Sequence, residues 1–191
     1  MGEIRITGGE FKGRRLKVPR GVRPTSAKLR EALFSILAGR LEGALVLDLF
    51  AGSGSLGLEA LSRGAEGAVF VERGGGATAV LRRNIASIGP EGRVRAMKAD
   101  WRKGVSILAG EGKGFDVILA DPPYGFWNDG RQKTKLLRMA SDFDIVSNNG
   151  ILVIERPARV PLPEEAPGLE RIFEREYGDS ALTFYGKGGT A

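Results

Sequence analysis

The sequence lacks two residue types that carry much of enzyme chemistry, because its 191 residues include no cysteine and no histidine. Without cysteine the chain cannot form disulfides, thiolate metal sites or a thiol nucleophile that attacks a substrate carbon. Without histidine it lacks the commonest general base and metal ligand, so proton chemistry must use carboxylates, tyrosine, lysine or water. We therefore expect a functional site without a metal ion.

Long apolar runs are also missing. No stretch approaches the roughly 20 residues of a membrane-spanning helix, and Met1–Arg5 lacks the apolar centre of a signal peptide. We therefore expect a cytoplasmic, monomeric protein without a membrane partner. The chain is long enough to bury roughly 70% of its unfolded surface. We expect a basic hairpin arm and linker over residues 1–24 and one catalytic domain over residues 25–191.

Positive charge is concentrated near the N-terminus. The chain has a net charge of +6, and residues 1–30 hold nine Lys or Arg against two Glu, so the other 161 residues sum to −1. A localised basic segment is typical of a partner with a phosphate backbone, although a solvated basic face would look the same. The residues that we expect to bind nucleic acid here are Lys12, Arg14, Arg15 and Lys17.

From residue 44 onward, apolar strand patterns alternate with helical patterns, which is typical of a parallel α/β sheet. The expected strands are 44–49, 67–72, about 93–97 and 115–120, and the expected helices are about 56–63 and about 76–87. Because the second helix begins in the triplet Gly74-Gly75-Gly76, and glycine disfavours helices, we expect it to start late.

The flanking segments complete the pattern. At the N-terminal side, residues 4–7 and 14–19 predict a small hairpin, and Thr25 or Ser26 can cap a helix that ends near Gly39. After the parallel part we expect a helix near 131–141, a strand at 151–155, a surface connection over Pro157–Pro167, and an antiparallel hairpin of strands 169–177 and 181–185.

A glycine-rich loop follows the first strand of the sheet. Gly52, Gly54 and Gly57 match G-x-G-x-x-G, a pattern shared with dinucleotide-binding loops. Asp48 ends the strand before the loop, and a carboxylate there would repel a pyrophosphate. It suits instead the positively charged amino group or sulfonium of S-adenosylmethionine, which is therefore the cofactor we expect.

Acidic residues also end the next two strands. Glu72 can accept from ribose hydroxyls and Asp100 from an adenine amino group, although each alone is more often a helix cap or turn residue. Together with Asp48 they predict a track for the cofactor. The other expected members of this site are Phe50, Gly52, Ser53, Gly54 and Trp101.

The run Asp121-Pro122-Pro123-Tyr124 follows the apolar strand 115–120. A carboxylate and a proline carbonyl at a strand end can accept both hydrogens of one amino group, and an aromatic ring can stack on a base. Two prolines also make a rigid turn without any chemistry. We predict that Asp121, Pro122 and Tyr124 are catalytic, and that Phe126 and Trp127 either extend the stacking surface or anchor the loop.

These motifs resemble class I methyltransferases, and more closely the RsmD family of 16S rRNA guanine-N2 methyltransferases. The resemblance rests on Gly8–Leu16, Arg23-Pro24-Thr25, Arg30–Phe34, Asp48–Leu61, Asp121–Tyr124 and Tyr177–Asp179. It implies a doubly wound, Rossmann-like sheet of seven mostly parallel strands with an antiparallel C-terminal hairpin. It also implies S-adenosylmethionine as methyl donor, a guanine of 16S rRNA in assembling 30S particles as substrate, and a cofactor pocket closed by Arg23 and Thr25. Gly74-Gly75-Gly76 and Trp101 depart from the family pattern.

Three other functions remain open from the residues alone. A DNA adenine-N6 methyltransferase shares the loop chemistry but usually needs a larger recognition region than the roughly 40 residues before the sheet. A protein glutamine methyltransferase would leave the basic arm without a purpose. A non-catalytic ribosome-assembly factor would bind RNA in a salt-sensitive manner and transfer nothing.

Overall fold

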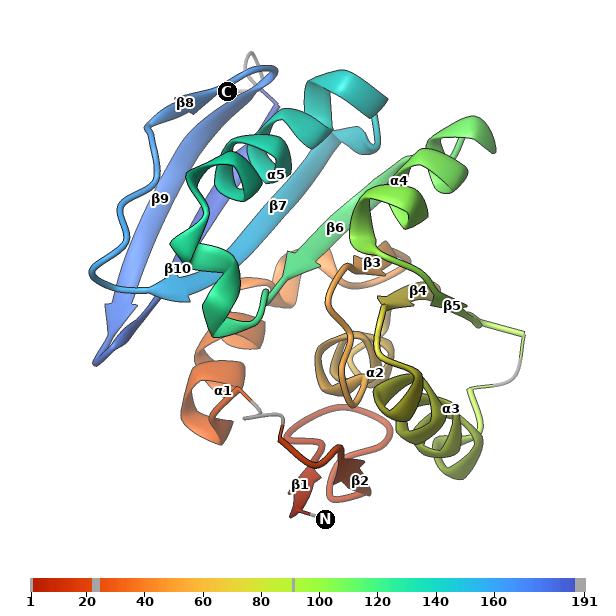
Figure 1. Ribbon diagram of the computed structural model, residues 1–191. Coiled ribbons are helices and arrows are strands. Elements are labelled where there is room, and N and C mark those ends of the chain that lie inside the picture. Colours follow the sequence, from red (N-terminus) through yellow and green to blue (C-terminus); the bar gives the residue numbers. More distant parts are fainter. Residues whose placement is uncertain (1, 22–24, 91, 188–191) are drawn as a thin grey trace.

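The computed structural model describes residues 2–21, 25–90 and 92–187. Arg23, which the sequence analysis assigns to the cofactor pocket, lies outside these residues. Most of the chain forms one eight-stranded sheet with the order β5-β4-β3-β6-β7-β10-β9-β8 (Figure 1). Its strands are β3 (Leu45–Asp48), β4 (Gly67–Glu72), β5 (Val94–Lys98), β6 (Phe115–Ala120), β7 (Val146–Pro157), β8 (Glu165–Ala166), β9 (Leu169–Tyr177) and β10 (Ser180–Gly186).

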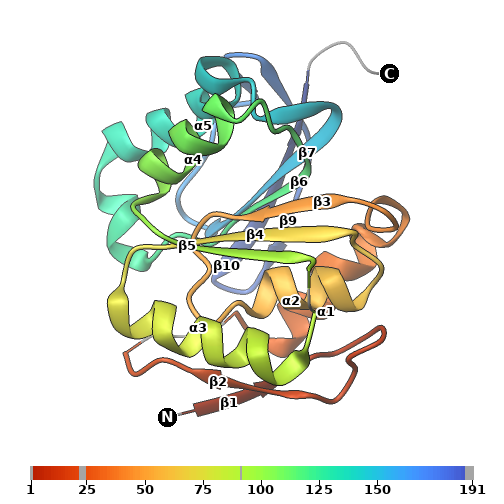
Figure 2. The ribbon, with the colours of Figure 1, turned by 90° about the vertical axis from the view of Figure 1, so that its right-hand side faces the viewer.

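Helices cover both faces of this sheet (Figure 2). One layer holds α1 to α3 and the other holds α4 and α5, and each layer buries its own apolar cluster against the strands. The helices are α1 (Ala27–Ile36), α2 (Ser55–Ser62), α3 (Gly75–Ile88), α4 (Trp101–Gly110) and α5 (Gly130–Phe143), with short 3-10 turns η1 (Ala38–Arg40) and η2 (Tyr124–Asn128). None of the helices in the described part of the chain has the length and apolar character needed to span a bilayer.

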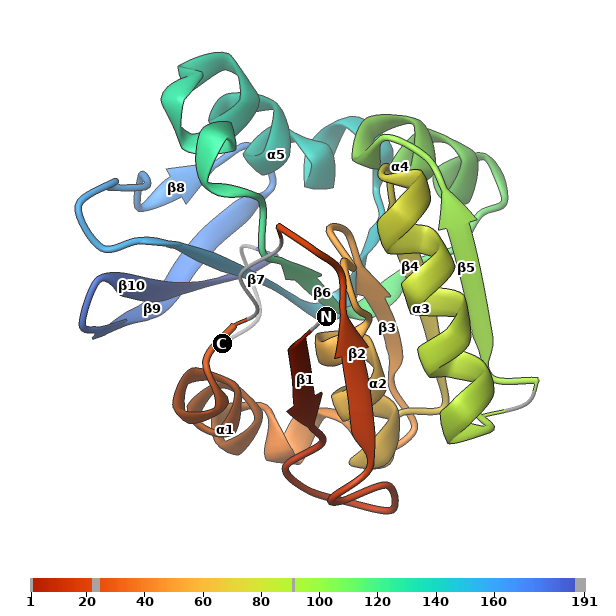
Figure 3. The same ribbon diagram turned by 60° about the horizontal axis from the view of Figure 1, so that its bottom comes forward.

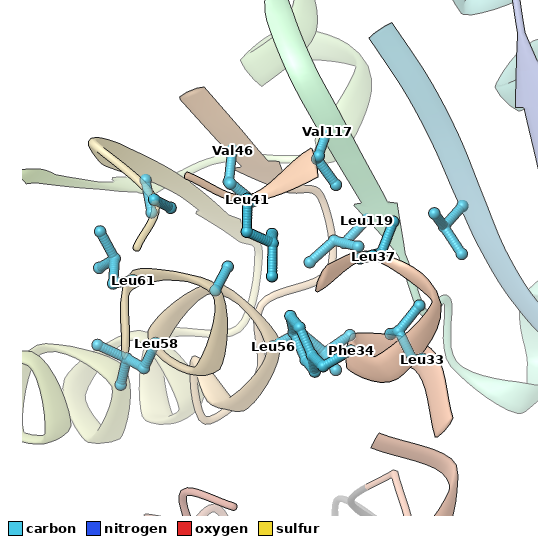
Figure 4. Packing of buried hydrophobic residues seen from close by; sticks show 14 of the residues in the cluster. Leu33, Phe34, Leu37, Leu41, Val46, Leu56, Leu58, Leu61, Val117 and Leu119 are labelled. Carbon is cyan, nitrogen blue, oxygen red and sulfur yellow. The ribbon is translucent and has the colours of Figure 1, made fainter. Parts of the chain in front are cut away.

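The core under the first layer joins α1 and α2 to the central strands (Figure 4). Leu33, Phe34 and Leu37 from the α1 segment lie in one cluster with Leu56 of α2 and Leu119 of β6. Since β6 is buried along almost its whole length, both faces of the strand are apolar, as expected for the centre of a parallel sheet.

The order of the strands creates a switch point between β3 and β6. From β3 the chain builds outward through β4 to β5, and it then returns to β6 on the other side of β3 and continues to β7, with all these neighbours parallel. In such sheets ligands bind beyond the carboxyl ends of the two strands at the switch. Asp48 is the last residue of β3, and Asp121 directly follows β6.

The predicted doubly wound sheet with an antiparallel C-terminal hairpin is confirmed, since β10 pairs antiparallel with both β7 and β9. It has one strand more than the seven expected, because two residues of the proline-rich connection, β8, pair with the start of β9. Ser26, rather than Thr25, caps α1 by accepting from the backbone N–H of Leu29.

Two expectations about helices were wrong. Helix α4 was not predicted; Asp100 caps it, and Trp101, Val105 and Leu108 form its buried stripe at helical spacing. Helix α3 does not start late, because Gly74 is its N-cap and Gly75 its first residue. The penalty for glycine applies to helix interiors, whereas the first turn has no intrahelical N–H bonds to lose.

The predicted N-terminal hairpin is confirmed as β1 (Gly2–Arg5) paired antiparallel with β2 (Arg15–Val18). It lies against α2 and α3 on their side away from the sheet (Figures 2 and 3). The hairpin loop is fixed by Glu59 of α2, whose carboxylate accepts from the backbone N–H groups of Thr7 and Gly8, the hydroxyl of Thr7 and the guanidinium of Arg63.

The Glu59 carboxylate therefore holds the basic arm in place. Its side chain is 0% exposed, so removing it leaves the partly buried N–H donors of Thr7 and Gly8 without their acceptor. We expect Glu59→Ala to lower the free energy of unfolding by about 3 kcal/mol, measured by urea denaturation. The exposed Glu66, just beyond α2, gives the matched control Glu66→Ala. Equal stability of the two variants would contradict this role for Glu59.

Candidate functional site

Asp48, the last residue of β3, has a buried carboxylate oxygen that accepts no hydrogen bond from the described residues. The residue is 1% exposed, and its Oδ2 accepts from the backbone N–H of Gly57 in the first turn of α2 at 3.1 Å. Its Oδ1 is buried and has no hydrogen-bond partner among the described residues. Burial, with a smaller contribution from Asp121, raises the pKa of Asp48 to about 7. A buried oxygen of this kind suits a cationic or hydrogen-bond-donating ligand group.

Asp121 faces the same space and is held from the N-terminal side of the chain. The hydroxyl of Thr25 donates to Asp121 Oδ2 at 2.8 Å, which links the start of α1 to the end of β6. Burial raises the pKa of Asp121 to about 6, and the bond from Thr25 partly opposes this rise. Pro122 is buried beside it, whereas Asp121 itself is partly exposed at the mouth of the site. The two carboxylates thus share a region that favours bound positive charge.

The glycine loop between β3 and α2 is held by Glu72 at the end of β4. One carboxylate oxygen of Glu72 accepts from the backbone N–H of Gly52 at 2.9 Å, and the other accepts from Gly74. Gly54 has φ of +80°, a conformation that favours glycine. Gly57 must be glycine for a different reason: a side chain there would collide with the ring of Phe70 in β4.

Sequence reasoning missed Asn84, which joins the loop to the basic arm. This residue of α3 is buried. Its side-chain amide donates to the carbonyls of Ser53 and Lys17, and its carbonyl accepts from Lys17. A buried asparagine in an amphipathic helix was the available signal, but nothing in the sequence indicated its partners.

The residues expected around adenine have structural roles as well. Asp100 caps α4 and accepts from Arg102, and the bond from the Arg102 side chain lowers the pKa of Asp100. Beside it, Trp101 forms an aromatic cluster with Phe50 and Phe126, at centroid distances of 5.6 to 6.4 Å. This cluster joins the end of β3 to the start of α4 and to the loop after β6.

The three aromatic residues of η2 differ in exposure. Trp127 is 7% exposed and packs in the core beneath α5, a position that favours the loop-anchor alternative. Phe126 is half-buried between Trp127 on one side and Phe50 and Trp101 on the other. Tyr124 is 62% exposed. It therefore offers an aromatic face next to Asp121, and it contacts Arg159 from the loop after β7.

The basic side chains of the arm are on its outer surface. Lys12, Arg14, Arg15 and Lys17 are all exposed, while Phe11, Leu16 and Val18 between them are buried. The carboxylate of Glu3 lies 3.4 Å from the guanidinium of Arg15, and at this exposure such a pair contributes little to stability. The arm therefore combines an apolar inner face with a cationic outer one.

The chain matches the family described as "Conserved hypothetical protein 95" over residues 4–186. A Bacillus subtilis protein, "Putative rRNA methyltransferase YlbH", is 34% identical over 97% of this chain and 100% of its own length. The Haemophilus influenzae "Ribosomal RNA small subunit methyltransferase D" is 32% identical over 84% of this chain and 82% of its own length. The chain belongs to the RsmD family.

The fold of this RsmD family member agrees with its solved relatives. The structure titled "Putative methyltransferase yhhF from Escherichia coli" superposes with a TM-score of 0.84 at 33% identity, covering 99% of this chain and all of that one. The predicted family and the class I methyltransferase fold are therefore confirmed. The site residues themselves remain predictions.

Asp48 should make the ligand-free protein less stable as the pH rises. Its folded pKa of about 7 exceeds the ordinary value of 3.8, so the unfolded chain ionises first and the free energy of unfolding falls between about pH 4 and pH 7. We expect Asp48→Asn to remove much of this slope and to be more stable than the wild type at pH 8, by at most about 4 kcal/mol.

Urea denaturation from pH 4 to pH 8 measures this difference. Asp179→Asn, an exposed carboxylate in the β9–β10 turn, is the control and should follow the wild-type curve. Parallel curves for Asp48→Asn and the wild type would show that Asp48 does not titrate as described.

Proposed function

We propose that this chain transfers a methyl group from S-adenosylmethionine to the exocyclic N2 of a guanine in small-subunit (16S) rRNA. The observation that carries the proposal is the pair of carboxylates at the switch point, Asp48 and Asp121, beside the exposed ring of Tyr124. The names of the relatives, which are rRNA methyltransferases, support RNA as the substrate.

The residues of the site fit S-adenosylmethionine, which supplies an electrophilic methyl group on a sulfonium. Asp48 would hold the cationic end of the cofactor through its buried Oδ1, and Glu72 and Asp100 would face its ribose and adenine. Gly52, Ser53 and Gly54 would lie along it, with Phe50 and Trp101 beside the base. Thr25, which donates to Asp121, would lie where cofactor and substrate meet.

Asp121 and the carbonyl of Pro122 would position the target amino group. A guanine amino nitrogen is a poor nucleophile because its lone pair is delocalised into the ring. Two acceptors that hold its hydrogens can direct the lone pair at the methyl group, and such alignment contributes roughly 7 to 11 kcal/mol. After transfer the nitrogen loses a proton to Asp121 or to water, and the raised pKa of Asp121, about 6, makes it a better acceptor than an ordinary carboxylate.

Stacking and charge would hold the RNA. The exposed ring of Tyr124 can stack on a base that leaves its helix, a contact worth about 1 to 3 kcal/mol. The outer face of the arm, with Lys12, Arg14, Arg15 and Lys17, would bind phosphates. We propose that the protein acts as a monomer on an assembling 30S particle.

Methyl transfer to small subunits from cells that lack this protein tests the function. With labelled S-adenosylmethionine and mass spectrometry of the nucleosides, we expect N2-methylguanosine. N6-methyladenosine, or label in protein alone, would contradict the proposal, as would cofactor binding without transfer to any RNA.

In the same assay, Asp121→Ala should lower kcat by roughly 10²- to 10³-fold or more, because the amino group loses its main positioning acceptor. Binding of S-adenosylmethionine, followed by calorimetry, should remain close to that of the wild type. The control Asp179→Ala removes an exposed carboxylate from the β9–β10 turn and should leave kcat unchanged. Normal turnover of Asp121→Ala would remove Asp121 from the mechanism.

Replacing Arg14 and Arg15 with alanine should weaken RNA binding and its dependence on salt. Two lost phosphate contacts reduce the slope of log K against log salt concentration by about 1.4 to 1.8, while cofactor affinity stays constant. Lys103→Ala with Lys113→Ala removes two exposed cations near α4 as a control. If both double variants kept the wild-type slope, the arm would not contact phosphates.

A further inference from the structure

Arg159 contacts the ring on which a target base would stack. Its guanidinium carbon lies 5.4 Å from the centroid of the Tyr124 ring, and its Nη2 donates to the Tyr124 hydroxyl. Both side chains are exposed. The contact joins residues that are 35 positions apart in the chain, and neither the glycine loop nor the basic arm takes part in it.

The position of Arg159 is set by a buried arginine next to β10. Arg156 is 3% exposed, and its Nη1 donates to the carbonyls of Pro157, Ala158 and Val160 at 3.2, 2.9 and 2.8 Å. Its Nε and Nη2 donate to Thr183 and Glu174. One buried cation therefore fixes the backbone on both sides of Arg159.

The topology places this loop beside the reacting centre. Strand β7 pairs in parallel with β6, and Ile154 is the partner of Ala120. The segment after β7 therefore leaves the sheet at the same edge as Asp121 and Tyr124, which follow β6. Arg159 is a fixed neighbour of the substrate side of the site.

A guanine that stacks on Tyr124 with its N2 at Asp121 would turn its opposite edge, with N7 and O6, away from Asp121. Both atoms are acceptors, and the planar fork of arginine matches them with two parallel hydrogen bonds. Adenine has an acceptor and a donor at the same edge, so the fork cannot pair with both.

We propose that Arg159 is a specificity-determining residue that leaves the Tyr124 ring when the target base arrives and binds N7 and O6 of the guanine. This inference rests on the proposed function. It gives a physical reason for guanine over adenine that the acceptors Asp121 and Pro122 do not supply, because they can hold the amino group of either base.

The experiment compares wild-type protein with Arg159→Ala on small-subunit particles reconstituted from transcribed RNA. The RNA carries either guanosine or 7-deazaguanosine, which keeps N2 but lacks N7. On guanosine RNA we expect Arg159→Ala to lower kcat/KM by roughly 5- to 150-fold, mainly through KM, as the loss of a bidentate base contact of about 1 to 3 kcal/mol implies. On 7-deazaguanosine RNA the ratio of wild type to variant should shrink severalfold, because the contact is already impaired.

Cofactor affinity and melting temperature should not change in Arg159→Ala. The control Arg138→Ala, which removes an exposed arginine of α5, should behave like the wild type. Equal activity of Arg159→Ala and the wild type would overturn the inference while leaving the proposed function intact. Two results together would overturn the inference in favour of a phosphate contact. The ratio of wild type to Arg159→Ala would be the same on 7-deazaguanosine RNA as on guanosine RNA, and the variant's slope of log K against log salt concentration would be lower by about one. Lower melting temperature and cofactor affinity would overturn it in favour of a structural role. A wild type that forms no N2-methylguanosine on guanosine RNA would refute the proposed function and this inference with it.

Discussion

The site at the switch point is built around a buried carboxylate, Asp48, of which one oxygen has no hydrogen-bond partner among the described residues. Asp48 ends a central strand, one of its oxygens accepts from the backbone N–H of Gly57 in α2, and the other oxygen has no partner among the described residues. Such burial is unfavourable to the charged form and raises the pKa to about 7. The switch point brings Asp121 to the same edge, where burial raises its pKa as well. A site built in this way favours a cationic or hydrogen-bond-donating ligand.

Side-chain hydrogen bonds connect the N-terminal segment to this site. Glu59 fastens the hairpin loop to α2, Asn84 connects Lys17 to the glycine loop, and Thr25 donates to Asp121. Side-chain hydrogen bonds thus join the arm to the glycine loop through Asn84, and the start of α1 to Asp121 through Thr25. RNA bound to the arm and cofactor bound to the loop would act on one connected framework.

Residues that interrupt a strong local pattern could be predicted from the sequence. Asp48 and Asp121 each end an apolar strand, and the family and fold predicted from these motifs are confirmed. Contacts between distant segments left no such signal in the sequence. Glu59 meets Thr7 across 52 positions. Arg156 is buried within a strand, although no local rule predicts burial for this arginine. Helix α4 was not predicted, because Gly104 lies in its interior and lowers the helix propensity of a short segment, so the spacing of Trp101, Val105 and Leu108 gave only a weak helical signal. Trp127 was ambiguous because burial of a ring depends on the helix that later covers it.

Proton release on cofactor binding tests whether two carboxylates of raised pKa, Asp48 and Asp121, form the cation site. Calorimetric titration of S-adenosylmethionine at pH 6.5, in buffers of different ionisation enthalpy, counts the protons that leave on binding. Because much of Asp48 is protonated at this pH, we expect a release of roughly half a proton or more, falling toward zero above pH 8. Binding at pH 6.5 with no proton release would contradict the account.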